Sequence, residues 1–115
     1  MQVGVDIVQI ERLGGVLARR PGFRDRVFTP IELADARRGD VLDGSATEIA
    51  RLAARFAAKE ATRKALGDLQ LGWQQVEVRT GSDGAPTLYV RGEPSPLALS
   101  LSHDAGVAIA FVAGA

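Results

Sequence analysis

The sequence has no cysteine and a single histidine, His103. The missing thiols exclude disulfide bonds, thiolate catalysis and cysteine-based metal sites. One imidazole also excludes a zinc site made of several histidines within one chain. The carboxylates are therefore the side chains in which a metal site has to be sought.

The sequence also lacks an excess of one charge and any long apolar run. Its 14 basic and 14 acidic residues give a net charge of zero, which favours neither nucleic acid nor a membrane surface as a partner. No stretch approaches the about 18 consecutive apolar residues of a membrane-spanning helix, and the N-terminal residues do not resemble a signal peptide. We therefore expect a cytoplasmic, soluble protein.

The length of 115 residues and an apolar fraction of 46% predict one domain, residues 1–115, with a real core. Residues 2–10 alternate and are rich in valine and isoleucine, which predicts a strand. Residues 11–20 predict a helix, and residues 23–29 a short connector that Phe23, Val27 and Phe28 hold to the core.

Two capping boxes predict where the later helices begin. Thr29, Pro30 and Glu32 predict a short helix that reaches about Arg38. Ser45, followed three residues later by Glu48, forms the second capping box and starts the longest helix. That helix ends where Gly67 provides a C-cap.

The last third of the chain predicts two antiparallel strand pairs. One is a hairpin with its turn at residues 82–84, and the other is closed by residues 104–106. The fold class is therefore α+β, with an N-terminal strand, helices that include one long central helix, and an antiparallel β-meander. The last strand is apolar on both faces, which indicates a central position in the sheet or burial against another chain.

The long helix places two charges inside an apolar stripe. At about 100° per residue, Glu60 and Lys64 continue the stripe formed by the apolar residues Ile49, Leu52, Ala53, Phe56 and Ala57. A buried, unpaired charge costs several kcal/mol, so something must compensate these two. Three explanations are open: an i,i+4 pair between them, a cation or phosphate that completes the site, or a helix end that turns outward.

Two further residues stand out in the same way. Asp6 lies among apolar neighbours on the first strand and either caps the following helix or contributes to a site. His103 at the end of a late strand is either structural or functional. Two carboxylates, Asp6 and Glu60, are hard oxygen ligands of the kind that hold Mg²⁺ together with water and phosphate oxygens. The GxxxxGK[ST] and GxGxxG phosphate loops are both missing, so isolated basic side chains such as Lys64 would have to meet a phosphate.

The chain resembles the holo-acyl-carrier-protein synthases, the small 4′-phosphopantetheinyl transferases. The resemblance covers essentially the entire chain, in the order and spacing of the family. It is carried by Gly4-Val5-Asp6-Ile7, by Phe28-Thr29 with Glu32, by Arg55-Phe56-Ala57-Ala58-Lys59-Glu60-Ala61 with Lys64-Ala65-Leu66-Gly67, and by Ser100-Leu101-Ser102-His103.

The resemblance implies the phosphopantetheinyl transferase fold and transfer of 4′-phosphopantetheine from coenzyme A to a serine of an apo acyl carrier protein. It further implies that Asp6 and Glu60 hold Mg²⁺, that Lys64 and His103 contact the coenzyme, and that the protein is a homotrimer with the coenzyme between protomers. Glu60 is the expected general base, with a water held by Asp6 as the alternative.

Other roles implied by the resemblance concern binding. Arg55 and Asp104, with His103, are candidates for contacts with the 3′-phosphate or the pantetheine arm. An acidic carrier protein is expected to dock on basic residues of the early chain: Arg12, which matches the family position, and Arg19, Arg20 and Arg24, which match only in charge.

Two alternative functions are also open. One is a Mg²⁺-dependent phosphohydrolase, and the other is a non-enzymatic homotrimeric binding module.

Overall fold

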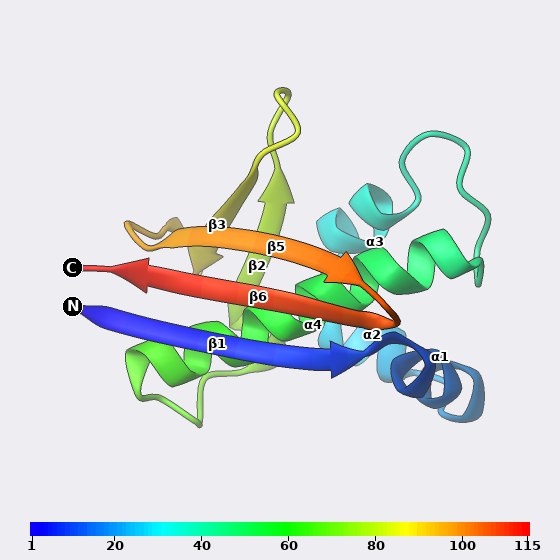
Figure 1. Cartoon of the computed structure of the whole chain (residues 1–115), viewed down its shortest axis with the longest axis horizontal. Coiled ribbons are helices and arrows are strands. Elements are labelled where there is room, and N and C mark those ends of the chain that lie inside the picture. Colours follow the sequence, from blue (N-terminus) through cyan, green and yellow to red (C-terminus); the bar gives the residue numbers. More distant parts are fainter.

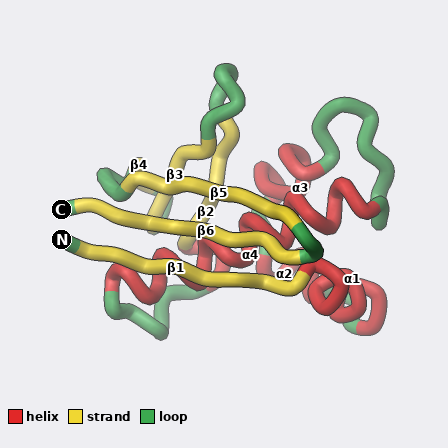
Figure 2. Tube along the Cα trace, viewed as in Figure 1, coloured by secondary structure: helices red, strands yellow, loops and turns green.

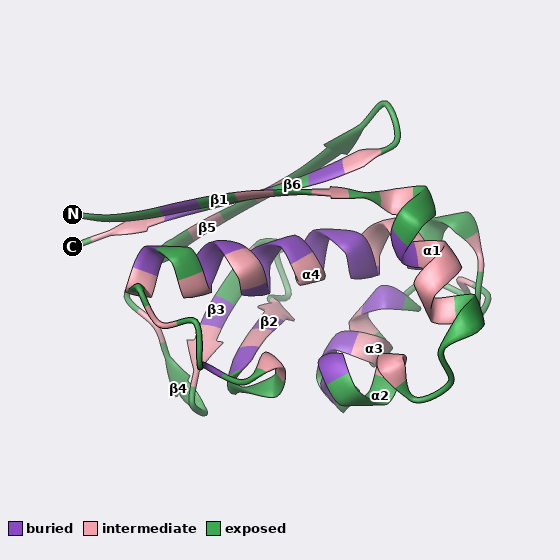
Figure 3. Ribbon diagram, turned by 90° about the horizontal axis from the view of Figure 1, so that it is seen from below, coloured by how far each residue is buried: buried purple, intermediate pink, exposed green.

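The computed structural model describes residues 1–115 (Figures 1 and 2), and it places one long helix between two β-sheets (Figure 3). In chain order the elements are β1 (Gln2–Gln9), α1 (Ile10–Arg19), α2 (Phe23–Val27), α3 (Pro30–Ala36), α4 (Ala46–Leu66), η1 (Trp73–Gln75), β2 (Val76–Thr80), β3 (Pro86–Val90), β4 (Glu93–Pro94), β5 (Ala98–Asp104) and β6 (Val107–Gly114). The α+β class is confirmed. None of the helices has the length and apolar character needed to cross a bilayer.

The predicted meander divides into two sheets. One is antiparallel with the order β1-β6-β5, and the other has the order β2-β3-β4. The last strand lies in the centre of its sheet, where it pairs with the first strand so that Asp6 faces Ala110. The strands separate because α4 is apolar on opposite sides, and each side needs a sheet to cover it.

Helix α4 is buried on most of its circumference, not along a single stripe (Figure 3). The sheet of β1, β6 and β5 lies on one side, and β2, β3 and α3 lie on the other. Alanines make this possible, because small side chains let backbone come close from several directions; Ala53, Ala57, Ala58 and Ala61 are all fully buried.

The predicted helix caps fix the start of α3 and both ends of α4. Thr29 and Glu32 form the complete capping box, with each side chain accepting from the other's backbone N–H. Ser45 accepts from the Glu48 N–H, but the Glu48 carboxylate turns to Gly44, so the second box is only half formed. Gly67 has the left-handed φ of 66° that a C-cap glycine provides.

Residues 23–27 correct one expectation, since they form the helix α2 and not a connector. The expected anchoring is confirmed, because Val27 and Phe28 are 1% exposed. The side chain of Gln74 donates to the carbonyls of Asp25 and Phe28, which satisfies the end of this short helix. These contacts attach α2, which follows α1, to the short helix η1 that precedes β2.

Candidate functional site

Gly4 brings the first strand into direct contact with the long helix. A Cβ at this position would lie 1.9 Å from the carbonyl oxygen of Ala61 and 2.9 Å from the Ala65 nitrogen. Only glycine allows so close an approach. Asp6 lies on the same face of β1, one pleat further along, and so meets the turn of α4 that carries Glu60 and Lys64.

Asp6 and Glu60 line the same surface hollow. The hollow has a volume of about 570 Å³ and lies between β1, α1 and α4. Its basic side is formed by Arg12, Arg19 and Arg20 of α1 and its end, and its apolar side includes Phe23 and Phe56. The structure thus collects at one place both carboxylates and three of the four arginines named from the sequence. Asp6 is not a helix cap, because Gln9 is the N-cap residue of α1.

The charges on α4 are paired differently from the i,i+4 pair considered above. The Lys64 ammonium donates to Asp6 Oδ1 and to the Val5 carbonyl, both at 3.1 Å. Glu60 Oε1 instead accepts from Arg63 Nη1 at 3.1 Å. The Lys64 side chain is 52% exposed, whereas Ala61 and Ala65 beside it are buried, so only the Lys64 face of this helix end is open to solvent.

The donor set at the hollow fits Mg²⁺. No group of three metal-binding side chains occurs anywhere in the chain, so an all-protein cage is absent. Mg²⁺ does not require one, since it commonly uses one or two carboxylates and completes its shell with water and phosphate oxygens. Asp6 and Glu60 each engage one oxygen with a cationic side chain, and each retains a second oxygen for a further ligand.

His103 lies on the opposite flank of α4. It lines a separate hollow of about 320 Å³ with Thr47 and Arg51, near the start of the helix. Arg51 and Glu60 are nine residues apart, which at about 100° per residue places them on opposite sides of the helix. Asp104 is next to His103 and accepts from the Ala105 N–H in the turn between β5 and β6. Within one chain, the structure therefore does not bring His103 and Asp104 to the Asp6–Glu60 hollow.

Arg55 and Arg24 also lie away from that hollow. Arg55 is only 5% exposed and donates to Thr80 Oγ1 and to the Arg51 carbonyl. Arg24 on α2 lies 2.9 Å from the buried Glu48 carboxylate, where Arg37 also binds. Both arginines thus hold elements of the fold together.

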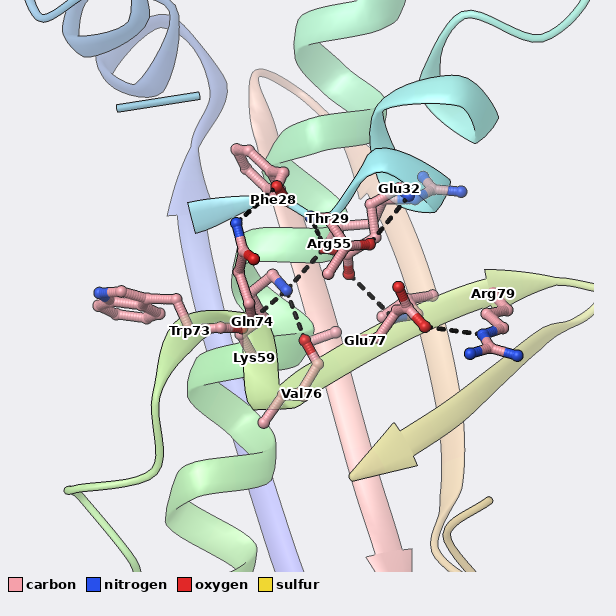
Figure 4. A network of polar contacts seen from close by, with 12 residues as sticks. Phe28, Thr29, Glu32, Arg55, Lys59, Trp73, Gln74, Val76, Glu77 and Arg79 are labelled. Carbon is pink, nitrogen blue, oxygen red and sulfur yellow. Dashed lines mark hydrogen bonds and ion pairs between the residues drawn. The ribbon is translucent and has the colours of Figure 1, made fainter. Parts of the chain in front are cut away.

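A buried ion pair between α3 and α4, shown in Figure 4, was not predicted from the sequence. Lys59 Nζ lies 2.7 Å from Glu32 Oε1, and both side chains are fully buried. Lys59 also donates to the carbonyls of Trp73 and Val76, so the three protons of the ammonium meet three acceptors. Glu32 accepts in addition from the backbone N–H groups of Thr29 and Val78.

Burial lowers the pKa of Lys59, while the neighbouring Glu32 carboxylate acts in the opposite direction. The pair joins α3, α4 and the start of β2 into one unit. The signal that could have revealed the pair is the run of alanines around Lys59, because small residues on all sides favour a helix that is buried on more than one side. Glu32 gave no such signal, because the capping box fully explained its presence.

Comparisons with known proteins identify relatives of the whole chain. Residues 2–112 match the 4′-phosphopantetheinyl transferase superfamily. A holo-[acyl-carrier-protein] synthase from Frankia alni is 43% identical, over 96% of this chain and 92% of the relative. A crystal structure of a holo-(acyl-carrier-protein) synthase from Bacillus anthracis in complex with CoA (3′,5′-ADP) has a TM-score of 0.78 and 32% identity, over 96% of this chain and 92% of that one. The ACPS-CoA complex from Chronobacterium ammoniagenes has a TM-score of 0.80 and 29% identity, over 96% of this chain and 93% of that one.

Proposed function

The chain belongs to the 4′-phosphopantetheinyl transferase superfamily, and from this membership we propose that it is the enzyme that converts an apo acyl carrier protein to its holo form. It transfers 4′-phosphopantetheine from coenzyme A to a serine hydroxyl of the carrier. The observation that supports this function is the hollow lined by the carboxylates of Asp6 and Glu60 and by the basic residues of α1. The Lys64 ammonium donates to Asp6 beside it. The ACPS-CoA complex from Chronobacterium ammoniagenes supports the choice of substrate.

The reaction exchanges one phosphorus–oxygen bond for another. The serine oxygen bonds to the phosphorus that carries the pantetheine arm, and the bond from that phosphorus to the bridging oxygen breaks. Adenosine 3′,5′-bisphosphate leaves with the bridging oxygen, and the hydroxyl proton passes to a base. Glu60 is the proposed base, because its carboxylate lines the hollow. A water held by Asp6 is the alternative.

Asp6 and Glu60 would also hold Mg²⁺. When bound there, the ion would supply positive charge to the pyrophosphate oxygens. Lys64 adds its own ammonium next to Asp6, where it can neutralise charge that develops as the phosphorus–oxygen bond breaks. Since the Lys64 side chain is 52% exposed, it can leave Asp6 for a phosphate at little cost in stability.

The separation of His103 from Glu60 supports a site shared between copies of the chain. Coenzyme contacts from His103 and Asp104, which lie on the other flank of α4, would then reach a coenzyme held at the Asp6–Glu60 hollow of a neighbouring protomer. The outer face of β1 and β6 fits such an assembly, since it exposes the apolar residues Val3, Val5, Ile7, Ile109 and Phe111. The proposed assembly is a homotrimer.

Arg55 is proposed to act on the coenzyme only indirectly. Its guanidinium is buried and bonded to Thr80, so it supports the packing of α4 against β2.

Carrier docking is proposed for the basic wall of the hollow. Arg12, Arg19 and Arg20 line it from α1 and its C-terminal end, where an acidic carrier can bring its serine toward Glu60. Arg24 belongs to the sequence-based set but lies on α2 against Glu48, so its share in docking is proposed to be small. The domain is proposed to comprise residues 1–115 as a single unit, working in the cytoplasm.

One assay tests the function. The chain is incubated with coenzyme A, Mg²⁺ and an apo carrier protein, and the carrier is weighed by mass spectrometry. Transfer adds one phosphopantetheine to the carrier. A phosphohydrolase would consume coenzyme A without modifying the carrier, and a binding module would do neither.

Variants locate the reaction in the hollow. Asp6→Asn and Glu60→Gln should each lower the transfer rate by at least about 100-fold, as loss of a catalytic acid or base does. The fold should stay intact by circular dichroism. An active variant of either residue would contradict the proposed metal site.

Arg12→Glu tests the docking surface. It should weaken carrier binding more than coenzyme binding.

A further inference from the structure

Arg63 holds the carboxylate of Glu60. Its Nη1 donates to Glu60 Oε1 at 3.1 Å, within one turn of α4. The two side chains are 17% and 30% exposed, so the pair is better shielded from water than Lys64. Such a pair is weakened less by solvent and salt than one on the open surface.

The Arg63 guanidinium is itself fixed from two directions. Its Cζ lies 4.6 Å from the centroid of the Trp73 ring, and its Nη2 donates to the Leu69 carbonyl. Trp73 in turn stacks on Phe56 at 5.2 Å, and its own carbonyl accepts from the buried Lys59. A planar guanidinium with a stacking partner and two acceptors has little freedom to move.

We propose that Arg63 is a positioning residue for Glu60: by holding Oε1, it presents Oε2 to the hollow for a divalent cation and for the serine proton. Arg63 is not among the residues that line the hollow, so it acts only through Glu60. Hydrogen-bonded supports of this kind orient metal-binding carboxylates. The proposal rests on the proposed function of the Asp6–Glu60 hollow.

The positive charge of Arg63 and its hold on the Glu60 carboxylate predict opposite changes in cation affinity when the Arg63 side chain is removed. A positive guanidinium close to a cation site repels the cation, so its loss would strengthen cation binding if charge alone mattered. If Arg63 positions Glu60, its loss frees the carboxylate and weakens binding, because supports of this kind contribute about 10-fold or more to affinity. The sign of the change therefore decides between the two.

The test measures Mn²⁺ binding to Arg63→Met without coenzyme, from the electron paramagnetic resonance signal of free Mn²⁺. Mn²⁺ is a suitable probe because it prefers the same oxygen ligands as Mg²⁺. We expect binding about 10-fold weaker than in the unmodified protein and a kcat about 10-fold lower, with little change in the KM for coenzyme A. Binding that is unchanged or tighter overturns the proposal.

Arg79→Met is the matched control. Arg79 on the hairpin likewise pairs with a carboxylate and lies over an aromatic ring, with Glu77 at 2.7 Å and the Tyr89 ring centroid 3.8 Å from its Cζ, but it does not contact Glu60. It should bind Mn²⁺ and turn over as the unmodified protein does. Trp73 is the only tryptophan, so a change in its fluorescence in Arg63→Met, and not in Arg79→Met, verifies that the stack is lost.

Glu60→Gln separates this proposal from the one on which it rests. If Glu60→Gln loses Mn²⁺ binding while Arg63→Met keeps it, the metal site stands and the positioning role of Arg63 fails. If Glu60→Gln binds Mn²⁺ as tightly as the unmodified protein, the metal site itself fails, and the positioning role fails with it. Equal melting temperatures of the variants exclude a general loss of structure as the cause.

Discussion

Helix α4 carries two lysine–carboxylate pairs that differ in almost every respect. Lys59 and Glu32 are 2.7 Å apart with both side chains fully buried, whereas Lys64 and Asp6 are 3.1 Å apart with side chains 52% and 18% exposed. The two lysines are five residues apart, which at about 100° per residue turns them roughly 140° from each other around the helix. One pair faces the inside of the fold, and the other lies at the surface, where Asp6 lines the hollow.

This difference indicates that the Lys59–Glu32 pair is structural, whereas Lys64 and Asp6 can take part in the reaction. All protons of the Lys59 ammonium meet protein acceptors, so no ligand can reach it. Lys64 has only the Val5 carbonyl and one oxygen of Asp6, and water or a phosphate can replace either. The same residue type thus fixes the helix on one side and remains available for substrate on the other.

The largest effect on stability is expected from Lys59→Met. Removing the ammonium leaves the Glu32 carboxylate buried beside two carbonyls, and breaking a buried pair in this way costs about 3–5 kcal/mol. Urea unfolding followed by circular dichroism measures the loss. The double variant with Glu32→Gln should regain part of it, and a loss below 1 kcal/mol in the single variant would show that the pair is not structural.

Gly4→Ala should produce the next largest effect. The new methyl group would meet the Ala61 carbonyl at 1.9 Å, so β1 must move away from α4. Overpacking of this kind costs about 1–3 kcal/mol. Because the shift carries Asp6 away from Glu60, Mn²⁺ binding should weaken as well. Alanine at Gly14, where the nearest atoms of Ile49 are 3.4 Å away, is the control, and equal results at the two glycines would contradict the close contact at Gly4.

Acid should weaken the fold through Glu48. Burial raises the pKa of its carboxyl, but hydrogen bonds from Gly44 and Arg37 and the positive charge of Arg24 outweigh burial and lower the pKa below its ordinary value of 4.5. The unfolded chain therefore binds the proton first as the pH falls, and the free energy of unfolding decreases below about pH 4.5. Glu48→Gln should lose part of this pH dependence in urea unfolding. An unaltered pH dependence would exclude Glu48 as its source.

Lys64→Met should have the smallest effect on stability. A pair this exposed contributes about 0–1 kcal/mol. Its transfer rate, however, should fall by at least about 10-fold, because a cation near the breaking bond is lost. Steady-state kinetics and urea unfolding of the same preparation give both values. A large loss of stability with normal turnover would reverse the roles assigned to the two lysines.

Local signals in the sequence predicted most of the elements. The Thr29–Glu32 box, the Gly67 cap and both hairpin turns depend only on neighbouring residues, and all are present. The division into two sheets was not predicted, because alternating apolar residues do not specify which side of α4 a strand covers.

The fold brings only some of the proposed site residues together, and their contacts were not predicted from the sequence. Asp6 and Glu60 are brought to one hollow, as the two carboxylates suggested. The pairing of Glu60 with Arg63 was missed because positions three and four residues away are equally close on a helix. Lys64 pairs instead with Asp6, which is distant from it in the sequence. The position of His103 on the other flank of α4 depends on tertiary packing that no local pattern contains.

The most direct test of the site is anomalous diffraction from a crystal grown with coenzyme A and Mn²⁺. We expect an anomalous peak from a Mn²⁺ ion that is bound by the carboxylates of Asp6 and Glu60 and by pyrophosphate oxygens of the coenzyme. A peak that lacks either carboxylate, or a coenzyme bound away from the hollow they line, would contradict this expectation.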